Sequence, residues 1–240
     1  MHRVLSKALE DAVKDELIHK NPAKLVTPPP KNKYEASFLT VKEIREMLKK
    51  FKDDEMFIPV LLSVLPGLRR GEVLGLQWKD IDFDNRLIRI RNNYVMVDGN
   101  PVLQGKTKTD KSSRNIVVAE RIINSLKDHQ HAQKKMRVRL GKDYFKSDFV
   151  CTWMDGKPFN PSHVSRAFSA RMKTYSLPMI RFHDLRHSNA SLMLSQNAPM
   201  KGASDRLGHS TIQITSDLYG HAERSVQEQI ANMIDNVIWG

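Results

Sequence analysis

Apolar residues recur at three- and four-residue spacing near the N-terminus and form one stripe: Val4, Leu5, Ala8, Leu9, Ala12, Val13 and Leu17. This spacing predicts a single amphipathic helix over residues 1 to about 19. We expect it to end at Asn21, because a residue that precedes proline is pushed out of the α region. Three prolines follow at residues 28–30 among lysines. They predict a stiff, basic, extended linker that closes a first segment at residue 35.

The second segment, residues 36–240, opens with helical patterns. Thr40 and Glu43 have the spacing of a capping box, which predicts a helix that runs to about Phe51. A mostly apolar helix is expected over about residues 55–65 and a further helix through about residue 78. Arg69 should therefore lie at the turn between two packed helices.

Strand patterns follow these helices. Residues 87–91 (LIRIR) alternate between apolar and basic, residues 98–99 (DG) are a hairpin-turn dipeptide, and residues 116–118 (IVV) are apolar again. From Glu120 onward the periodicity is helical almost throughout, with breaks near residues 155–161, 176–178 and 197–199. The patterns predict a mainly helical α+β domain with a small three-stranded antiparallel sheet.

The composition favours a polyanionic partner. The formal net charge is +12 and the pI is near 9.8, and each phosphate that Lys or Arg neutralises releases counterions. Ribosomal and membrane-surface proteins are also basic, so charge alone does not decide the class. With Cys151 as the only cysteine, no signal-peptide pattern and no apolar run of about 18 residues, we expect a reducing, cytoplasmic setting without a membrane span.

The last quarter of the chain carries the most specific chemistry. Residues 183–187 (HDLRH) are followed by residues 207–209 (LGH) and, ten residues further, by Tyr219; residues 67–72 (GLRRGE) lie upstream. A phenol supplies an oxygen nucleophile, guanidinium forks bind phosphate oxygens, and imidazoles move protons. This arrangement resembles the tyrosine recombinases, the phage integrase family, and above all the integrases of temperate phages and conjugative transposons.

The resemblance implies a role for each residue of these boxes. Arg69 and Arg186 take the places of the two arginines that clamp the scissile phosphate. His183 would hydrogen-bond the phosphate or assist proton removal from the tyrosine. His209 takes the position of a donor to the transition-state phosphate, and Tyr219 takes that of the nucleophile.

Further positions have supporting roles in the family. Glu72 takes the place of an acidic residue that buttresses the site. Lys108 aligns without a gap with the lysine of a β-hairpin that protonates the leaving 5′ oxygen, and Lys106 and Lys111 remain competitors for that role. Residues expected to contact DNA are Arg70, Lys106, Lys111 and Arg114. Pro66 stands where the family usually has threonine, from which we expect a local effect only.

Less specific interpretations of these residues exist. Asp184 could pair with Arg186 or His187, which would make the second box an ordinary core histidine beside a salt bridge. His183 and His187 have the i,i+4 spacing of a metal site, although the glutamate of the zinc-protease motif and a third ligand are absent. Tyr219 could be a structural tyrosine.

Taken together, the resemblance implies the catalytic domain of a site-specific recombinase that cleaves and rejoins DNA through a 3′-phosphotyrosine, without cofactor or metal. Its partner would be double-stranded DNA, bound by a tetrameric synapse of chains that are monomers alone, with room for a DNA-bending or directionality factor. Residues 1–35 resemble the last helix of a preceding DNA-binding domain whose remainder is missing, plus its linker. The alternatives are a relaxing type IB topoisomerase and a non-catalytic DNA-binding remnant.

A final amphipathic stripe follows Tyr219 and consists of Val226, Ile230, Met233, Ile234, Val237 and Ile238. It predicts a C-terminal helix that docks on its own domain or on a neighbouring protomer.

Overall fold

A computed structural model describes residues 2–27, 38–105 and 113–208 of the chain. The chain divides into two compact units, Met1–Glu35 and Ala36–Gly240. In these described ranges, no helix combines the length and the apolar character needed to cross a lipid bilayer.

The first unit contains α1 (His2–Lys14) and a 3₁₀ turn, η1 (Pro22–Leu25). The prediction of a helix to about residue 19 was wrong at its C-terminal end. Glu16 adopts a φ of 59°, and the Leu17 N–H donates to the Ala12 carbonyl at 2.9 Å, so the chain leaves α1 through a left-handed C-terminal cap. Asn21 then holds η1 against α1, because its side-chain amide donates to the Ser6 carbonyl at 2.8 Å.

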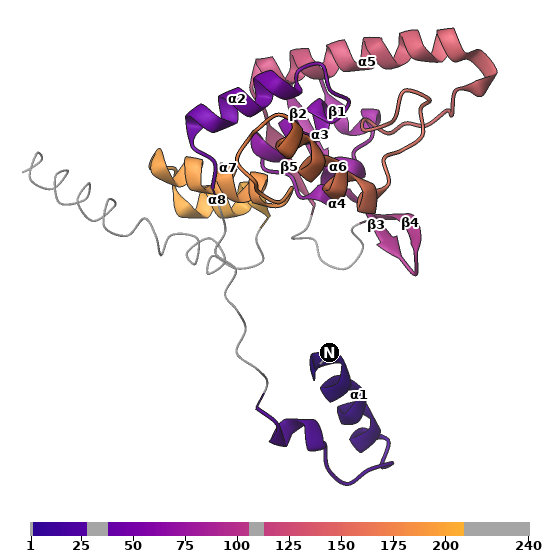
Figure 1. Ribbon diagram of the computed structural model, residues 1–240, viewed down its shortest axis with the longest axis vertical. Helices are drawn as coiled ribbons and strands as arrows, with labels where there is room; N and C mark the ends of the chain where they lie inside the picture. The colour runs from indigo at the N-terminus through magenta and orange to yellow at the C-terminus, as the bar shows by residue number, and fades with distance from the viewer. Residues whose placement is uncertain (1, 28–37, 106–112, 209–240) are drawn as a thin grey trace, which may run out of the picture. The chain divides into compact units, whose positions relative to one another are not determined.

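The second unit contains seven α-helices among its described residues. They are α2 (Val41–Phe51), α3 (Phe57–Val64), α4 (Arg70–Leu74), α5 (Glu120–Leu140), α6 (Pro161–Thr174), α7 (Asp184–Ser195) and α8 (Met200–Leu207), with 3₁₀ turns η2 (Trp78–Asp80) and η4 (Gly141–Asp143). The predicted capping box is confirmed: the Thr40 N–H donates to Glu43 Oε2 at 2.7 Å, and the Glu43 N–H donates to Thr40 Oγ1 at 3.3 Å. In Figure 1, α5 lies along one side of this unit.

The three-stranded antiparallel sheet is present, in the order β1 (Ile81–Asp82), β2 (Leu87–Ile90) and β5 (Arg114–Val117). The predicted hairpin is not part of it. Strands β3 (Asn92–Val97) and β4 (Asn100–Gly105) form a separate two-stranded sheet, which projects from the unit in Figure 1. After Arg91 the chain no longer pairs with the three-stranded sheet, because β3 packs on α4 instead. The contact is close: a Cβ on Gly75 would lie only 3.0 Å from the Tyr94 nitrogen.

Helix does not continue through residues 144–160, contrary to the near-continuous helix expected after Glu120. This stretch makes two isolated bridges, Gln77 with Phe149 and Thr152 with Pro158. Gly156 turns the chain at a φ of 84°, and the Phe145 N–H donates to the Asp155 carbonyl at 2.7 Å. Backbone groups thus pair across a compact loop.

Buried apolar residues directly precede or follow the predicted site residues. Leu68, Leu185 and Leu207 have no exposed surface and Phe182 is almost fully buried. The Phe182 ring contacts that of Phe168 edge-on, with centroids 5.4 Å apart, and the Phe168 ring stacks on that of Phe51. The core therefore fixes the backbone from which the site side chains project.

The surroundings of Gly67, between α3 and α4, show how tightly this backbone is packed. Its φ is 76°, and a Cβ there would lie 2.6 Å from Asn189 Oδ1 and 2.7 Å from Leu207 Cδ2. We expect Gly67→Ala to lower the free energy of unfolding by about 1–3 kcal/mol in urea titrations, through strain and overlap.

The matched control is Gly202→Ala in α8, where a Cβ meets no atom within 4 Å. It should raise stability by about 0.5–1 kcal/mol, since alanine favours a helix. Equal stability of the Gly67→Ala variant and the wild type would contradict tight packing at this turn.

Candidate active site

Arg69 stands immediately before α4, where the turn after α3 ends. Its backbone is extended (φ −68°, ψ 151°), and its N–H donates to Glu72 Oε2 at 3.0 Å. Its guanidinium donates through Nη1 to Glu72 Oε1 at 3.0 Å and through Nη2 to the Gly208 carbonyl at 2.5 Å. With 37% of its side chain exposed, Arg69 is both held in place and accessible.

Helix α7 brings the second box to the same place. His183 precedes its first residue, and Arg186 lies in its first turn. The Arg186 side chain points inward and is 2% exposed; its Nη1 donates to the Gly67 carbonyl at 2.7 Å and its Nη2 to the Leu207 carbonyl at 2.5 Å. Burial, together with the charge of Arg69, lowers the pKa of the Arg186 guanidinium to about 9. It remains a cation at neutral pH.

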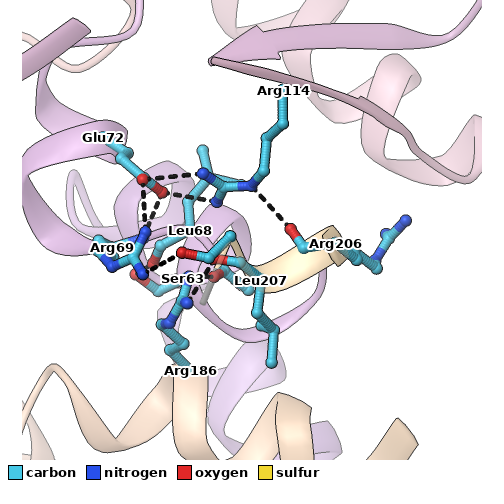
Figure 2. Close-up of polar contacts among 10 residues, drawn as sticks. Ser63, Leu68, Arg69, Glu72, Arg114, Arg186, Arg206 and Leu207 are labelled. Carbon is cyan, nitrogen blue, oxygen red and sulfur yellow. Dashed lines mark hydrogen bonds and ion pairs between the residues drawn. The ribbon is translucent and has the colours of Figure 1, made fainter. Parts of the chain in front are cut away.

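The C-terminal end of α8 is the point where three arginines meet (Figure 2). The carbonyls of Arg206, Leu207 and Gly208 accept hydrogen bonds from Arg114 Nε at 2.8 Å, Arg186 Nη2 at 2.5 Å and Arg69 Nη2 at 2.5 Å. The last carbonyls of a helix have no partner within it and carry partial negative charge, so guanidinium groups stabilise them.

Gly208 ends α8 in the left-handed conformation, with a φ of 64° and a ψ of 47°. A Cβ at this position would lie 2.8 Å from Arg114 Nη1. Glycine therefore permits both the backbone turn and the close approach of the arginine.

Glu72 joins two of these arginines. Its carboxylate is 1% exposed and accepts from Arg69, and also from Arg114 Nη1 at 2.9 Å and Nη2 at 2.8 Å. Figure 2 shows the Arg114 fork facing both carboxylate oxygens. The side chain of Arg114 is 9% exposed. The expectation that Arg114 contacts DNA does not fit this placement, because all three of its guanidinium nitrogens donate to acceptors in the protein.

The His183 imidazole is neutral at neutral pH. Partial burial lowers its pKa to about 4, and the neighbouring His187, Arg186 and Arg69 act in the same direction. The His183 and His187 rings meet edge-to-face, with centroids 4.8 Å apart. The neutral imidazole has an unprotonated nitrogen, which a general base needs, while its low pKa makes it a weak base.

A hollow of about 390 Å³ opens beside His183. It is lined by Arg70, Ser165, Ser169, Arg181, Phe182 and His183, and Arg70 Nη1 donates to Ser165 Oγ at 2.6 Å. Cationic and hydroxyl groups that face a common space suit a phosphate backbone. A larger hollow of about 770 Å³, which includes Asp53, Asp54, Glu55 and Asp128 in its lining, contains none of the predicted site residues.

The structure thus brings together Arg69, Glu72, His183 and Arg186, with Arg70 at the rim. Five predicted site residues lie outside the described residues: Lys106, Lys108, Lys111, His209 and Tyr219. Their roles stay predictions. Gly208, the neighbour of His209, is described and lies against Arg69.

Sequence reasoning missed the partner of Asp184 and the hydroxyls at the rim. Asp184 is buried and accepts from Arg181 Nη2 at 3.0 Å and from the Arg181 N–H at 2.9 Å, a partner that the ion-pair alternative did not include. The spacing of Arg181 and Asp184, three residues apart at the start of a helix, was an available signal. No sequence signal pointed to Ser165 and Ser169.

Among the described residues, no group of three or more His, Cys, Asp or Glu side chains could hold a metal ion.

Comparisons with known proteins show the family to which the chain belongs. The model of the phage integrase family matches residues 37–225. The chain is 29% identical over 236 residues to the ICEBs1 integrase of Bacillus subtilis (strain 168), covering 98% of this chain and 64% of that protein. It is also 29% identical over 246 residues to a XerC-like tyrosine recombinase of Caldanaerobacter subterraneus subsp. tengcongensis, covering 94% and 61%.

Among solved structures, the fold is similar to the Tn1549 transposon integrase in complex with transposon right end DNA. The TM-score is 0.76 at 22% identity, over 96% of this chain and 78% of that chain. The chain belongs to the phage integrase family, as its boxes predicted, and it has the mainly helical fold expected of a catalytic domain in that family. It spans less than two thirds of the length of these two curated relatives.

The low pKa of His183 makes stability depend on pH. Between about pH 6.5 and pH 4 the unfolded chain binds a proton at this residue that the folded chain does not. The contribution of neutral His183 to the free energy of unfolding is therefore complete above pH 6.5 and is lost as the pH falls toward 4. We expect His183→Gln to flatten the fall in the free energy of unfolding over this range, by less than about 1.4 kcal/mol per pH unit, because solvent screens a partly exposed group.

The measurement is a urea titration at each pH, without DNA. His131→Gln, at an exposed position of α5, reports the effect of losing a histidine elsewhere. Equal pH slopes for His183→Gln and the wild type would show that His183 titrates alike in both states.

Proposed function

We propose that this chain carries the catalytic domain of a site-specific DNA recombinase, an integrase that acts on chromosomal or mobile-element DNA in the cytoplasm. The observation that carries the proposal is the pair of guanidinium groups of Arg69 and Arg186, held side by side by the carbonyls of Gly208 and Leu207. Membership in the phage integrase family supports the same activity.

The two arginines would bind the non-bridging oxygens of the scissile phosphate. A guanidinium has five N–H donors. In each arginine, two side-chain hydrogen bonds go to the protein, so others remain for the phosphate. Because the protein contacts fix both forks in advance, little reorganisation is needed when charge develops on the phosphate.

The Tyr219 oxygen would then attack phosphorus and form the 3′-phosphotyrosine, while the bond to the 5′ oxygen breaks. His183 would accept the phenol proton, which its neutral state allows, and Lys108 would protonate the departing 5′ oxygen. His209 would donate to the phosphate. The 5′-hydroxyl of the other strand reverses these steps and releases the tyrosine, so the energy of the phosphodiester is conserved without ATP or a metal ion.

DNA binding would involve more than the active site. Arg70 and the basic residues Lys106 and Lys111 would contact the phosphate backbone. Residues 1–35 would contribute the last helix of a core-DNA-binding domain and its linker. Four chains, each a monomer alone, would form the synapse, with an accessory factor that bends DNA or sets directionality.

Tyr219→Phe tests the nucleophile. The variant should form no covalent protein–DNA adduct on a nicked suicide substrate that carries the cognate core site, because the attacking oxygen is gone. Its DNA affinity should stay close to that of the wild type, since many basic groups contribute to binding. A denaturing gel detects the adduct.

The same assay separates the alternatives. An adduct at wild-type yield with Tyr219→Phe would remove this residue from the role. Absence of an adduct with the wild type, together with DNA binding, would indicate a non-catalytic binding module. Relaxation of a supercoiled plasmid without strand exchange would indicate a topoisomerase.

Lys108→Ala tests the general acid. Cleavage should slow by about 10²–10⁴-fold, the usual effect of removing a positioned acid. Sulfur at the bridging 5′ position should restore most of the rate, because a thiolate leaves without a proton. The loss in Arg69→Lys should not be restored, since lysine lacks the two-pronged contact with the phosphate.

Lys106→Ala and Lys111→Ala are the matched controls. Sulfur rescue of one of these variants, without rescue of Lys108→Ala, would assign the acid to that lysine instead.

A further inference from the structure

The hollow of about 390 Å³ in the candidate active site has two walls from different parts of the chain. One wall is formed by Ser165 and Ser169, which lie four residues apart on one face of α6. The other is formed by residues 181–183, which precede α7. Between the two serines in sequence stands Phe168, whose ring contacts that of Phe182 edge-on at 5.4 Å. This buried contact fixes the two walls relative to each other.

Arg181 is the cation on the second wall, and a buried carboxylate orients it. Its Nη2 donates to Asp184 Oδ1 at 3.0 Å, and its Nε and backbone N–H donate to Asp184 Oδ2 at 3.2 and 2.9 Å. The Asp184 carboxylate has no exposed surface, whereas the side chain of Arg181 is 56% exposed. The guanidinium is therefore held in one orientation while much of its surface stays accessible.

These contacts repeat those of Arg69, which with Arg186 forms the proposed phosphate clamp. Arg69 also stands three residues before a buried acid, Glu72, and its backbone N–H and guanidinium donate to the two oxygens of that acid. The exposed fractions are alike too, 37% for Arg69 and 1% for Glu72. Arg181 thus has the same local support as a proposed phosphate-binding arginine.

The hollow lies close to the clamp and contains further donors. The charges of both clamp arginines act on His183, which borders the hollow. Arg70 also lines the hollow, and its Nη1 donates to Ser165 Oγ at 2.6 Å. A DNA strand carries one phosphate about every 3.4 Å along the helix axis. When the scissile phosphate lies on the clamp, a neighbouring phosphate of the same strand is therefore close enough to reach the hollow.

We infer that this hollow is a second phosphate subsite, which binds the phosphate next to the scissile one and has Arg181 as its fixed donor. The hydroxyls of Ser165 and Ser169 complete it from α6. Two phosphates held at fixed points set the register of the strand, which is what phosphate contacts contribute to recognition. This inference rests on the proposed recombinase activity and names a substrate contact within it.

The test is a scan in which one phosphate of the cognate core site at a time is replaced by a neutral methylphosphonate. The Kd of the full chain for each duplex is measured by fluorescence anisotropy, and a suicide substrate locates the scissile phosphate. For the wild type, methylphosphonate at one neighbour of the scissile phosphate should raise Kd about tenfold or more, as expected from the loss of a charged hydrogen bond. In Arg181→Gln the same replacement should raise Kd by less than about twofold, because the partner of that phosphate is already missing.

Arg166→Gln is the matched control. Arg166 is an exposed residue of α6 next to Ser165 in sequence, and it does not line the hollow. This variant loses the same charge but should keep the full methylphosphonate effect. Melting temperatures establish that each variant is folded. If Arg181→Gln melts below the assay temperature, the double variant Ser165→Ala/Ser169→Ala replaces it, since it alters the opposite wall and leaves the carboxylate of Asp184 paired.

Each outcome decides the inference. The full methylphosphonate effect in Arg181→Gln, or in the double serine variant where it takes its place, would overturn the subsite and make the Arg181–Asp184 pair a structural support of α7. Loss of the effect only at a phosphate that is not next to the scissile one would also overturn it. The scan measures affinity and does not require cleavage. Absence of an adduct with the wild type would therefore refute the proposed function, while the scan would still show whether Arg181 binds a phosphate.

Discussion

One buried carboxylate, that of Glu72, is the interaction on which the candidate active site depends. Removing a carboxylate from water costs several kcal/mol unless charged hydrogen-bond partners compensate. Arg69 does so from the residue before α4, and Arg114 does so from β5. Two elements far apart in the sequence are thereby tied to one point, and loss of either arginine would leave a buried charge without part of its compensation.

The C-terminal end of α8 provides the second constraint. Its last three carbonyls would lack partners within the helix, and three guanidinium groups satisfy them in sequence order, from Arg114, Arg186 and Arg69. Because the positive charges of Arg69 and Arg186 oppose each other, a polyanion would stabilise the cluster further. A site of this kind holds its donors in place before the ligand arrives.

Close packing at the candidate site also explains the neutral state of His183 and the presence of glycine at residues 67 and 208. Partial burial beside two guanidinium groups keeps His183 neutral, which leaves one of its ring nitrogens unprotonated. Gly67 and Gly208 allow the backbone to approach Asn189, Leu207 and Arg114 more closely than any side chain would permit. The neutral state of His183 and the need for glycine at residues 67 and 208 thus both follow from close packing around the candidate site.

The sequence by itself determined the features that depend on neighbouring residues. The capping box at Thr40 and Glu43, the turn at Asp98 and Gly99 and the breaks between the C-terminal helices follow from local spacing. The boxes also sufficed to show the resemblance to the family, because each is short and chemically specific. The resemblance in turn implied the grouping of Arg69 with His183 and Arg186.

Only the tertiary structure decided the contacts between distant residues. Arg114 lies 42 positions from Glu72, and Arg69 lies 139 positions from Gly208, so no periodicity or local spacing records that they meet. An arginine in a basic stretch looks like a DNA contact in sequence whether it faces solvent or a buried carboxylate. For the same reason the separation of the β3–β4 hairpin from the three-stranded sheet was missed, since the packing of α4 against β3 arises only once the chain has folded. The Arg181–Asp184 pair is local in sequence, and only the burial of Asp184 was decided by the fold.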